Sequence, residues 1–283
     1  MEEKQHKNSV LPVSLQISNT PTVADLKNLV LYTSVKTLDD SICECQVTDD
    51  SFCFRTQTPQ GRYKILSEWK FEDFIGIEVV EGYEYGDDGG KSIRAIGTKF
   101  QPGHCCGGEP NLNKRVIEKS RLYHGKNDKV IITVRDIIMT TFWNYCKKNY
   151  GAGIPETDTS YIHPQNLKPW EKKAIVYINP YSGLRKAGKL FHTIEDYLIA
   201  AGFRMDTVTT FRENQVFEEM ALMDGNTFKS YYCRLVFSGD GLVHELINGY
   251  YHRQDHTELK LRFAAFPGGS ANSASFMGHW SYN

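Results

Sequence analysis

Residues 231–249 read YYCRLVFSGDGLVHELING, and this stretch decides the fold of the C-terminal part of the chain. Its first half, Tyr231–Phe237, is apolar enough for a buried strand, and Leu242–Tyr250 has the apolar spacing of a helix. Ser238-Gly239-Asp240-Gly241 lies between them and places one carboxylate where the helix begins. A strand that runs through a glycine turn into a helix is typical of a parallel α/β sheet.

The flanking sequence repeats this alternation of strand and helix. The predicted strands are Lys173–Ile178, Arg204–Thr210, Tyr231–Phe237 and Leu261–Phe266. Helices are expected up to Ala201, from the capping residue Asn214 through Met223, and up to Tyr250. Each strand ends in a polar loop, and open parallel sheets bind ligands at the carboxyl ends of their strands. We therefore expect the four loops to form one site.

The residue types in these loops suit phosphate chemistry. Free N–H groups at the start of a helix attract phosphate oxygens, and the Asp240 carboxylate could bind Mg²⁺ or accept a proton from a substrate hydroxyl. Asn179–Gly183 is a second such turn, in which Ser182 is expected to cap the helix, and Pro267–Asn272 is a third. Taken alone, Ser238–Gly241 could equally be an ordinary turn, so the prediction depends on the companion loops.

Motifs of other sites are missing from the sequence. There is no Gly-x-x-x-x-Gly-Lys-Ser/Thr loop, and no Gly-x-Gly-x-x-Gly follows the first strand. His244 is followed four residues later by Asn248 and not by His, so a zinc-protease site is excluded and His244 is expected to be an ordinary helical residue.

The N-terminal part reads as a mostly β domain. Strands are predicted at Leu29–Val35, Ser41–Val47, Ser51–Thr56, Gly61–Leu66, Phe74–Val80, Ser120–Tyr123 and Lys129–Val134. Residues 81–119 are glycine-rich and are expected to form a long variable insertion. Asp136 is expected to cap a helix over Ile137–Tyr150. This order fits a pleckstrin-homology-like domain, and a generic small β domain fits it equally well.

Composition and the positions of glycine and proline define the remaining domain boundaries. Residues 1–22 are predicted to be a flexible leader, 23–150 the pleckstrin-homology-like domain, 151–170 a linker and 171–283 the α/β lobe. The net charge of -1 argues against nucleic acid as a partner. No signal peptide or bilayer-spanning run is present, so a cytoplasmic protein is expected, with membrane contact limited to its periphery. The seven cysteines lack the spacing of a disulfide framework or a zinc site.

The loops together resemble a known family. Asn179–Gly183, Ser238–Gly249 and Pro267–Asn272 occur in the order and spacing of the diacylglycerol-kinase-type catalytic domain. The block Ser-Gly-Asp-Gly with His-Glu and Asn-Gly is most similar to sphingosine kinases, with ceramide kinases next. The resemblance covers residues 172–283 and implies an α/β fold with a parallel-sheet, nucleotide-binding lobe.

The resemblance also implies roles for individual residues. Asp240 would be the general base that deprotonates the primary hydroxyl of a lipid, with Ser238 and Gly239 lining the substrate side. The nucleotide, ATP as its Mg²⁺ complex, would be bordered by Asn179, Pro180, Tyr181, Thr210, Phe211, Arg212, Glu213, Asn214, Glu245, Gly269, Ser270 and Ala271. The expected reaction transfers phosphate from ATP to a sphingoid base.

Two departures from the family leave alternatives open. Ala271 stands where sphingosine kinases usually have glycine, and a methyl group is tolerable there only if the backbone is not left-handed. The family's lipid-binding β-sandwich lobe is expected to be missing after Asn283. The alternatives are a ceramide or diacylglycerol kinase, a truncated and inactive nucleotide-binding or adaptor protein, and a relative of NAD kinases.

Overall fold

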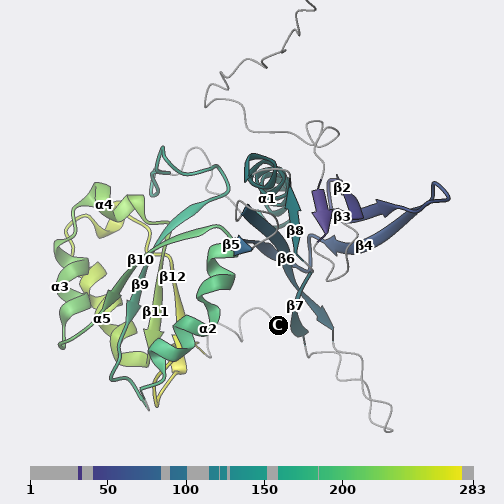
Figure 1. Cartoon of the computed structure of the whole chain (residues 1–283). Coiled ribbons are helices and arrows are strands. Elements are labelled where there is room, and N and C mark those ends of the chain that lie inside the picture. Colours follow the sequence, from purple (N-terminus) through teal and green to yellow (C-terminus); the bar gives the residue numbers. More distant parts are fainter. Residues whose placement is uncertain are drawn as a thin grey trace, which may run out of the picture.

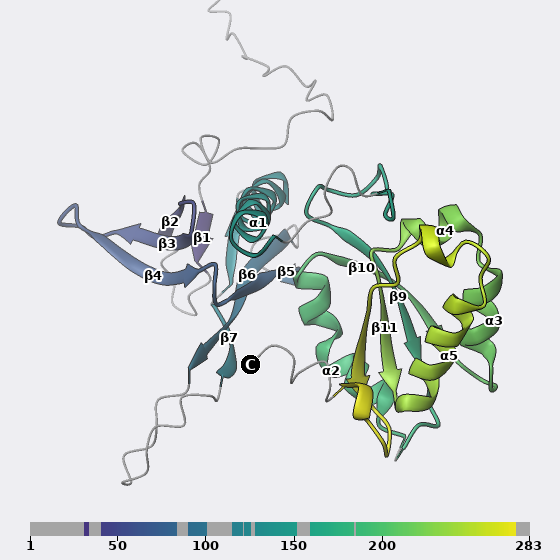
Figure 2. The same ribbon diagram turned by 180° about the vertical axis from the view of Figure 1, so that it is seen from behind.

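The fold was analysed in a computed structural model that describes residues 31–33, 41–83, 90–100, 115–120, 122–125, 128–151, 159–183 and 185–275. Figure 1 shows an N-terminal part built on strands and one helix beside a C-terminal part in which helices flank a sheet. Figure 2 shows the same arrangement from behind, with helix α2 on the side of the C-terminal part that faces the N-terminal part. No helix within these ranges is long and apolar enough to cross a bilayer.

The N-terminal part is an antiparallel sheet with the strand order β4-β3-β2-β1-β8-β6-β5, to which β7 adds by pairing with β6. Its strands are β1 (Leu31–Thr33), β2 (Ser41–Val47), β3 (Ser51–Gln57), β4 (Tyr63–Lys70), β5 (Phe74–Tyr83), β6 (Gly90–Phe100), β7 (Arg115–Lys119) and β8 (Tyr123–Gly125). Helix α1 (Asp128–Tyr150) follows them. The predicted mostly β region is confirmed, whereas its likeness to a pleckstrin-homology domain stays a prediction.

Alternating side chains of this sheet build one core. Phe52 and Phe54 of β3 are fully buried and pack edge to face, with ring centroids 5.8 Å apart. From α1, Ile131 and Val134 enter the same core without any exposed area. The period of two along the strand and the spacing of three along the helix both put apolar groups on the face that meets the other element.

Four predictions in this part were wrong. The strand expected at Ser120–Tyr123 falls between β7, which ends at Lys119, and β8, which begins at Tyr123. Lys129–Val134 is helical, because α1 begins at Asp128, and Asp136 is a buried residue within α1 and not its cap. The β-branched run at 130–134 favours a strand locally, but packing of Ile131 and Val134 against the sheet outweighs that preference. The expected insertion at 81–119 contains β6, which has Ile93, Ala95 and Ile96 completely buried.

The C-terminal part is a four-stranded parallel sheet with the order β10-β9-β11-β12. Its strands are β9 (Lys172–Ile178), β10 (Phe203–Thr209), β11 (Cys233–Ser238) and β12 (Phe263–Pro267). Its helices are α2 (Ala187–Ala200), α3 (Gln215–Leu222), α4 (Gly225–Ser230), α5 (Asp240–Tyr251) and the short η2 (His256–Glu258). Strand β10 lies on one side of β9 and β11 lies on the other, so the strand order reverses between β9 and β11. Such a switch point leaves a crevice at the carboxyl ends of the strands.

Helices cover both faces of this sheet. Ile175 and Tyr177 of β9 point to the face covered by α3 and α5, while the alternate residues Ala174 and Val176 pack with α2. All four side chains are at least 95% removed from solvent. This burial on both faces explains why the strands read as continuous apolar runs, and the predicted α/β lobe is confirmed.

Helix α4 was not expected from the sequence. Asp224 caps it, because its Oδ1 accepts hydrogen bonds from the N–H groups of Asn226 (3.1 Å) and Thr227 (2.9 Å). Gly225, which reads as the end of α3, is the first residue of this helix. An Asp followed by Gly is as typical of a turn as of a helix start, so local sequence left the two undecided.

Candidate functional site

The loops that follow β9 and β11 meet at the switch point. The Ser182 hydroxyl accepts a hydrogen bond from the Gly239 N–H (2.9 Å) and another from the Ser238 hydroxyl (3.3 Å). The expectation that Ser182 caps the next helix was wrong, since Lys186 occupies the cap position of α2. Ser182 instead joins the first loop to the acid-bearing loop, because the crevice brings their backbones within hydrogen-bonding distance.

The loop after β12 interlocks with the loop after β11. The Gly268 N–H donates to the Ser238 carbonyl at 3.0 Å, and the Asp240 N–H donates to the Ala271 carbonyl at 3.2 Å. A Cβ atom on Gly269 would lie 2.3 Å from the Gly239 Cα, so no side chain fits at this contact. The glycines therefore serve a close approach of two backbones.

The Asp240 carboxylate lies at the first position of α5 and is hydrogen-bonded to backbone. Its Oδ2 accepts from the Ser273 N–H at 2.9 Å and its Oδ1 from the Ala274 N–H at 3.0 Å. These two bonds, the Ala274 bond first, lower the pKa of the carboxyl below its usual value, because they stabilise the charged form. Asp240 is thus a partly exposed anion at neutral pH.

Beside these loops lies a hollow of about 430 Å³ lined by Gly183, Lys186, Pro267, Gly268, Gly269 and Ser270. Lys186 precedes the first turn of α2 and makes no side-chain capping bond. The first N–H groups of that turn have no partner within the helix. Together with the exposed Lys186 ammonium, they make this hollow suitable for an anion such as phosphate.

The loop after β10 is divided between a buried and an exposed end. Thr210 is 4% exposed and turns its hydroxyl back to the Ile178 carbonyl at 3.4 Å. Phe211 is 74% exposed, and its N–H donates to Oε1 of Gln215 at 3.1 Å. Asn214 has a left-handed backbone with a φ of 59° and forms no side-chain capping bond. Asn214 thus occupies the predicted cap position of α3, and its carbonyl accepts the Glu218 N–H at 3.0 Å, but its side chain does not cap the helix.

Two further predicted residues are held in place by backbone groups. Oδ1 of Asn179 accepts the Tyr181 N–H at 2.9 Å, which fixes the turn after β9 while the Tyr181 ring stays 69% exposed. Oε2 of Glu245 accepts the Val216 N–H at 3.2 Å and so ties α5 to the start of α3.

The structure thus brings most of the predicted site residues to one edge of the sheet, and the loop of residues 210–214 lies at the same edge. The residues brought together there are Asn179, Pro180, Tyr181, Ser238, Gly239, Asp240, Gly269, Ser270 and Ala271. Ala271 is not in the left-handed region, so its methyl group is tolerated there. Sequence reasoning missed Lys186 and Asn272 as site residues. Asn272 closes its loop by accepting the Gly269 N–H (2.9 Å) and donating to the Gly269 carbonyl (2.8 Å). Its position at the end of a small-residue turn was the available signal.

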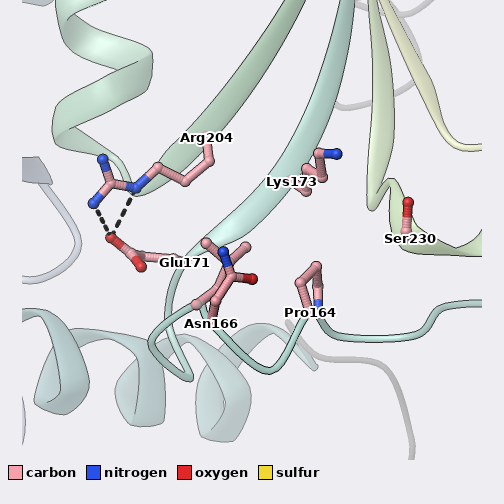
Figure 3. Close-up of a pocket in the computed structure, with 7 residues that line it drawn as sticks. Pro164, Asn166, Glu171, Lys173, Arg204 and Ser230 are labelled. Carbon is pink, nitrogen blue, oxygen red and sulfur yellow. Dashed lines mark hydrogen bonds and ion pairs between the residues drawn. The ribbon is translucent and has the colours of Figure 1, made fainter. Parts of the chain in front are cut away.

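A different hollow of about 450 Å³ lies at the opposite ends of the strands, where β9 and β10 begin. Figure 3 shows Lys173 and Ser230 on one side of it and the ion pair of Arg204 with Glu171 on the other. Lys173 is paired as well, with Asp206 at 2.9 Å. Because its cations are already paired with carboxylates, this hollow is less suited to an anion than the one beside Lys186.

Sequence comparisons with known proteins match the same part of the chain. Residues 173–283 match the family described as the diacylglycerol kinase catalytic domain. Sphingoid long chain base kinase 5 of Saccharomyces cerevisiae is 36% identical over 115 residues, which are 40% of this chain and 16% of that protein. Sphingosine kinase 1 of Mus musculus is 31% identical over 121 residues, 42% of this chain and 31% of that protein.

A ceramide kinase of Arabidopsis thaliana is 26% identical over 141 residues, 48% of this chain and 22% of that protein. The matched region therefore spans less than a third of the length of each of these relatives. The matched residues contain all of the loops at the switch point. In residues 173–283 the chain is therefore similar to the diacylglycerol kinase catalytic domain.

Proposed function

We propose that the protein is an ATP-dependent lipid kinase that phosphorylates the primary hydroxyl of a sphingoid base. One observation carries the proposal: an ionised carboxylate, Asp240, starts a helix at the switch point of a parallel sheet, next to loops that line a hollow of about 430 Å³. Phosphoryl transfer needs a group that orients and deprotonates the attacking hydroxyl and donors that hold the phosphates. The site supplies both types of group.

The phosphates of ATP would lie between the start of α2 and the loop after β12. Gly183 and Lys186, the residue at the cap position of α2, line one side, and Pro267–Ser270 lines the other. Tyr181 and Phe211, exposed at the ends of neighbouring strands, would border the remainder of the nucleotide. Asn179, Thr210 and Glu245 would then act mainly by fixing the backbone of the surrounding loops.

Asp240 would accept the proton of the lipid hydroxyl. Each of its carboxylate oxygens receives one backbone N–H and keeps lone-pair capacity for a substrate proton. The lowered pKa keeps the group deprotonated at neutral pH, so it is ready to act as a base. Mg²⁺ also fits this donor set, because the ion is commonly held by one or two carboxylates together with substrate phosphates and neutralises their charge.

The names of the relatives support a sphingoid base as the lipid. Both a long chain base kinase and a sphingosine kinase exceed 30% identity over the matched region, and the ceramide kinase is at 26%. Ceramide and diacylglycerol are therefore the competing substrates in the test.

The test incubates the purified chain with Mg²⁺, radiolabelled ATP and micelles of sphingosine, ceramide or diacylglycerol. We expect labelled sphingosine phosphate, and Asp240→Asn should lower turnover by about 100-fold or more. The matched control is His244→Gln, an exposed position on the same helix. Equal turnover of Asp240→Asn and the wild type would remove Asp240 from the base role. Binding of ATP without phosphorylation of any lipid would favour a nucleotide-binding protein without kinase activity.

A further inference from the structure

A groove of about 700 Å³ runs along the outer side of α3 and is separate from the phosphate hollow. Its lining consists of Phe211, Arg212, Gln215, Glu218, Glu219, Leu222, Met223, Asp224 and Thr227. Figures 1 and 2 place α3 and α4 on the side of the C-terminal part that is remote from the N-terminal sheet. No described part of the chain therefore covers this groove.

The groove contains unusual apolar exposure. Leu222 is 82% exposed and Phe211 is 74% exposed, and within the described ranges these are the two most exposed large hydrophobic residues. Both line the same groove. Single exposed apolar residues are ordinary, whereas two that line one groove add apolar contacts to its charged wall.

The polar wall of the groove is acidic. Glu218, Glu219 and Asp224 contribute three carboxylates against the single guanidinium of Arg212. The Arg212–Glu218 ion pair neutralises one of them, which leaves an excess of negative charge around the apolar side chains. A complementary partner therefore carries cations next to an apolar group.

The walls are fixed before any partner binds. Asp224 caps α4, and Glu219 accepts a hydrogen bond from Gln215 at 3.0 Å. Arg253 holds the last turn of α3 from beneath, because it donates to the carbonyls of Met220 (2.7 Å) and Met223 (2.5 Å). A preformed groove lowers the entropic cost of association.

We propose that this groove docks a peptide segment of a partner protein in which an apolar side chain is flanked by lysine or arginine. The exposure of Leu222 and Phe211 argues against a small molecule, because small-ligand sites enclose most of the ligand surface. The acidic wall argues against an anionic membrane, which the carboxylates would repel. A basic peptide satisfies both the charge and the open shape.

The docking surface shares the loop after β10 with the predicted nucleotide site. Phe211 and Arg212 line the groove and also belong to the loop predicted to border the nucleotide. A peptide seated there contacts that loop directly. The docking proposal goes beyond the kinase function and does not depend on it, since binding can be measured without turnover.

The test is fluorescence anisotropy with a labelled twelve-residue peptide of alternating leucine and lysine and a matched peptide with glutamate in place of lysine. The lysine peptide should bind the purified chain, and Leu222→Asp should weaken its binding by about tenfold or more. Glu218→Gln should weaken binding in the same direction. The matched control is Ile199→Asp, which changes a 50% exposed residue near the end of α2 and should leave the affinity unchanged.

Two results would overturn the proposal. One is equal affinity for the lysine and glutamate peptides, and the other is an equal effect of Leu222→Asp and Ile199→Asp. Sedimentation with vesicles of phosphatidylcholine and phosphatidylserine distinguishes a membrane: vesicle binding that Leu222→Asp abolishes would replace the peptide by a lipid surface. Circular dichroism of each variant confirms that the fold is intact.

Discussion

Asp240 combines two demands in a single side chain. In the proposed function it stays ionised to act as a base, and its carboxylate also closes the turn at Ser273 and Ala274 through two hydrogen bonds. Because those bonds favour the charged form, the lowered pKa and the loop closure have one cause. The carboxyl group therefore holds the loop at neutral pH, and the contact is lost only as the pH falls through its lowered pKa.

The backbone conformation of Arg185 can be tested at the residue scale. Its φ of 59° lies in the left-handed region, which costs a residue with a side chain roughly 1–2 kcal/mol. Replacement of Arg185 by glycine should therefore raise the free energy of unfolding by about 0.5–1 kcal/mol in urea denaturation.

Lys186→Gly serves as the matched control for that change. Lys186 has a φ of -95°, which any residue adopts, so glycine there should lower stability instead. If both glycine variants destabilise the chain equally, Arg185 does not bear backbone strain.

At the scale of elements, the junction of α3 and α4 depends on buried arginines. Arg253 is 6% exposed, donates to two carbonyls at the end of α3 and pairs with Asp255 at 2.8 Å. Arg234 is 1% exposed and donates to the Phe228 carbonyl at 2.9 Å, with its guanidinium 3.6 Å from the Phe228 ring. These cations satisfy carbonyl groups that the helix ends would otherwise leave unpaired.

Arg253→Met should accordingly lower the free energy of unfolding by about 2–4 kcal/mol, because it leaves buried carbonyls without a donor. Arg212→Met removes an arginine of the preceding loop from its ion pair with Glu218 of α3, whose side chains are about half exposed, 47% and 46%. That control should cost less than about 1 kcal/mol. A similar loss for both variants in urea denaturation would mean that the Arg253 bonds do not carry the junction.

Element type was predictable wherever the apolar period was long and undisturbed. The parallel strands were predicted to within two residues at each end, as for Arg204–Thr210 against the observed Phe203–Thr209. The element type of short segments, and of the β-branched segment at the start of α1, was not predictable. α4 is only six residues long, and the start of α1 reads as a strand. At the start of α1 tertiary contacts outweigh local preference, whereas at α4 the local sequence did not decide between a turn and a helix.

The candidate site likewise contains residues that the sequence could predict and residues that it could not. Glycines and the acid of Ser238–Gly241 are visible in the sequence because they carry the close approach and the charge directly. Ser182 and Asn272 act through bonds to Gly239 and Gly269. The bond of Ser182 depends on how two loops meet in space, which spacing along the chain does not reveal. The bond of Asn272 lies within a single turn, so its position at the end of that turn was a local signal.

At the scale of the whole molecule, Lys172 lies where the two parts meet. Its ammonium is 3.7 Å from the centre of the Trp143 ring of α1 and 5.5 Å from that of Tyr232. Burial lowers the pKa of this lysine to about 8, although the rings attract its charge. The folded chain therefore gives up this proton at a lower pH than the unfolded chain does.

Stability should consequently rise between pH 8 and 10.5, where the unfolded chain binds more protons. Lys172→Met removes this term, so the wild type should gain roughly 1–3 kcal/mol relative to the variant between pH 7 and pH 10. Urea denaturation across that range gives the comparison. A constant difference between the two proteins would contradict the lowered pKa.

Gly76 tests whether the two parts are packed as one body. It lies in β5, and a Cβ atom there would come within 2.0 Å of the Ala200 carbonyl oxygen and 2.7 Å of the Ala201 nitrogen at the end of α2. Both are backbone atoms that cannot move without shifting α2. Gly76→Ala should therefore lower the free energy of unfolding by about 1–3 kcal/mol.

Gly188→Ala separates this contact from the general effect of losing a glycine. Gly188 lies in α2, and a Cβ atom there meets no other atom within 4 Å, so alanine should raise the free energy of unfolding by about 0.5–1 kcal/mol through helix propensity. If Gly76→Ala lowers the free energy of unfolding while Gly188→Ala raises it, the strain of Gly76→Ala lies at the contact between β5 and α2. A Gly76→Ala protein as stable as the wild type would mean that this contact does not hold the two parts together.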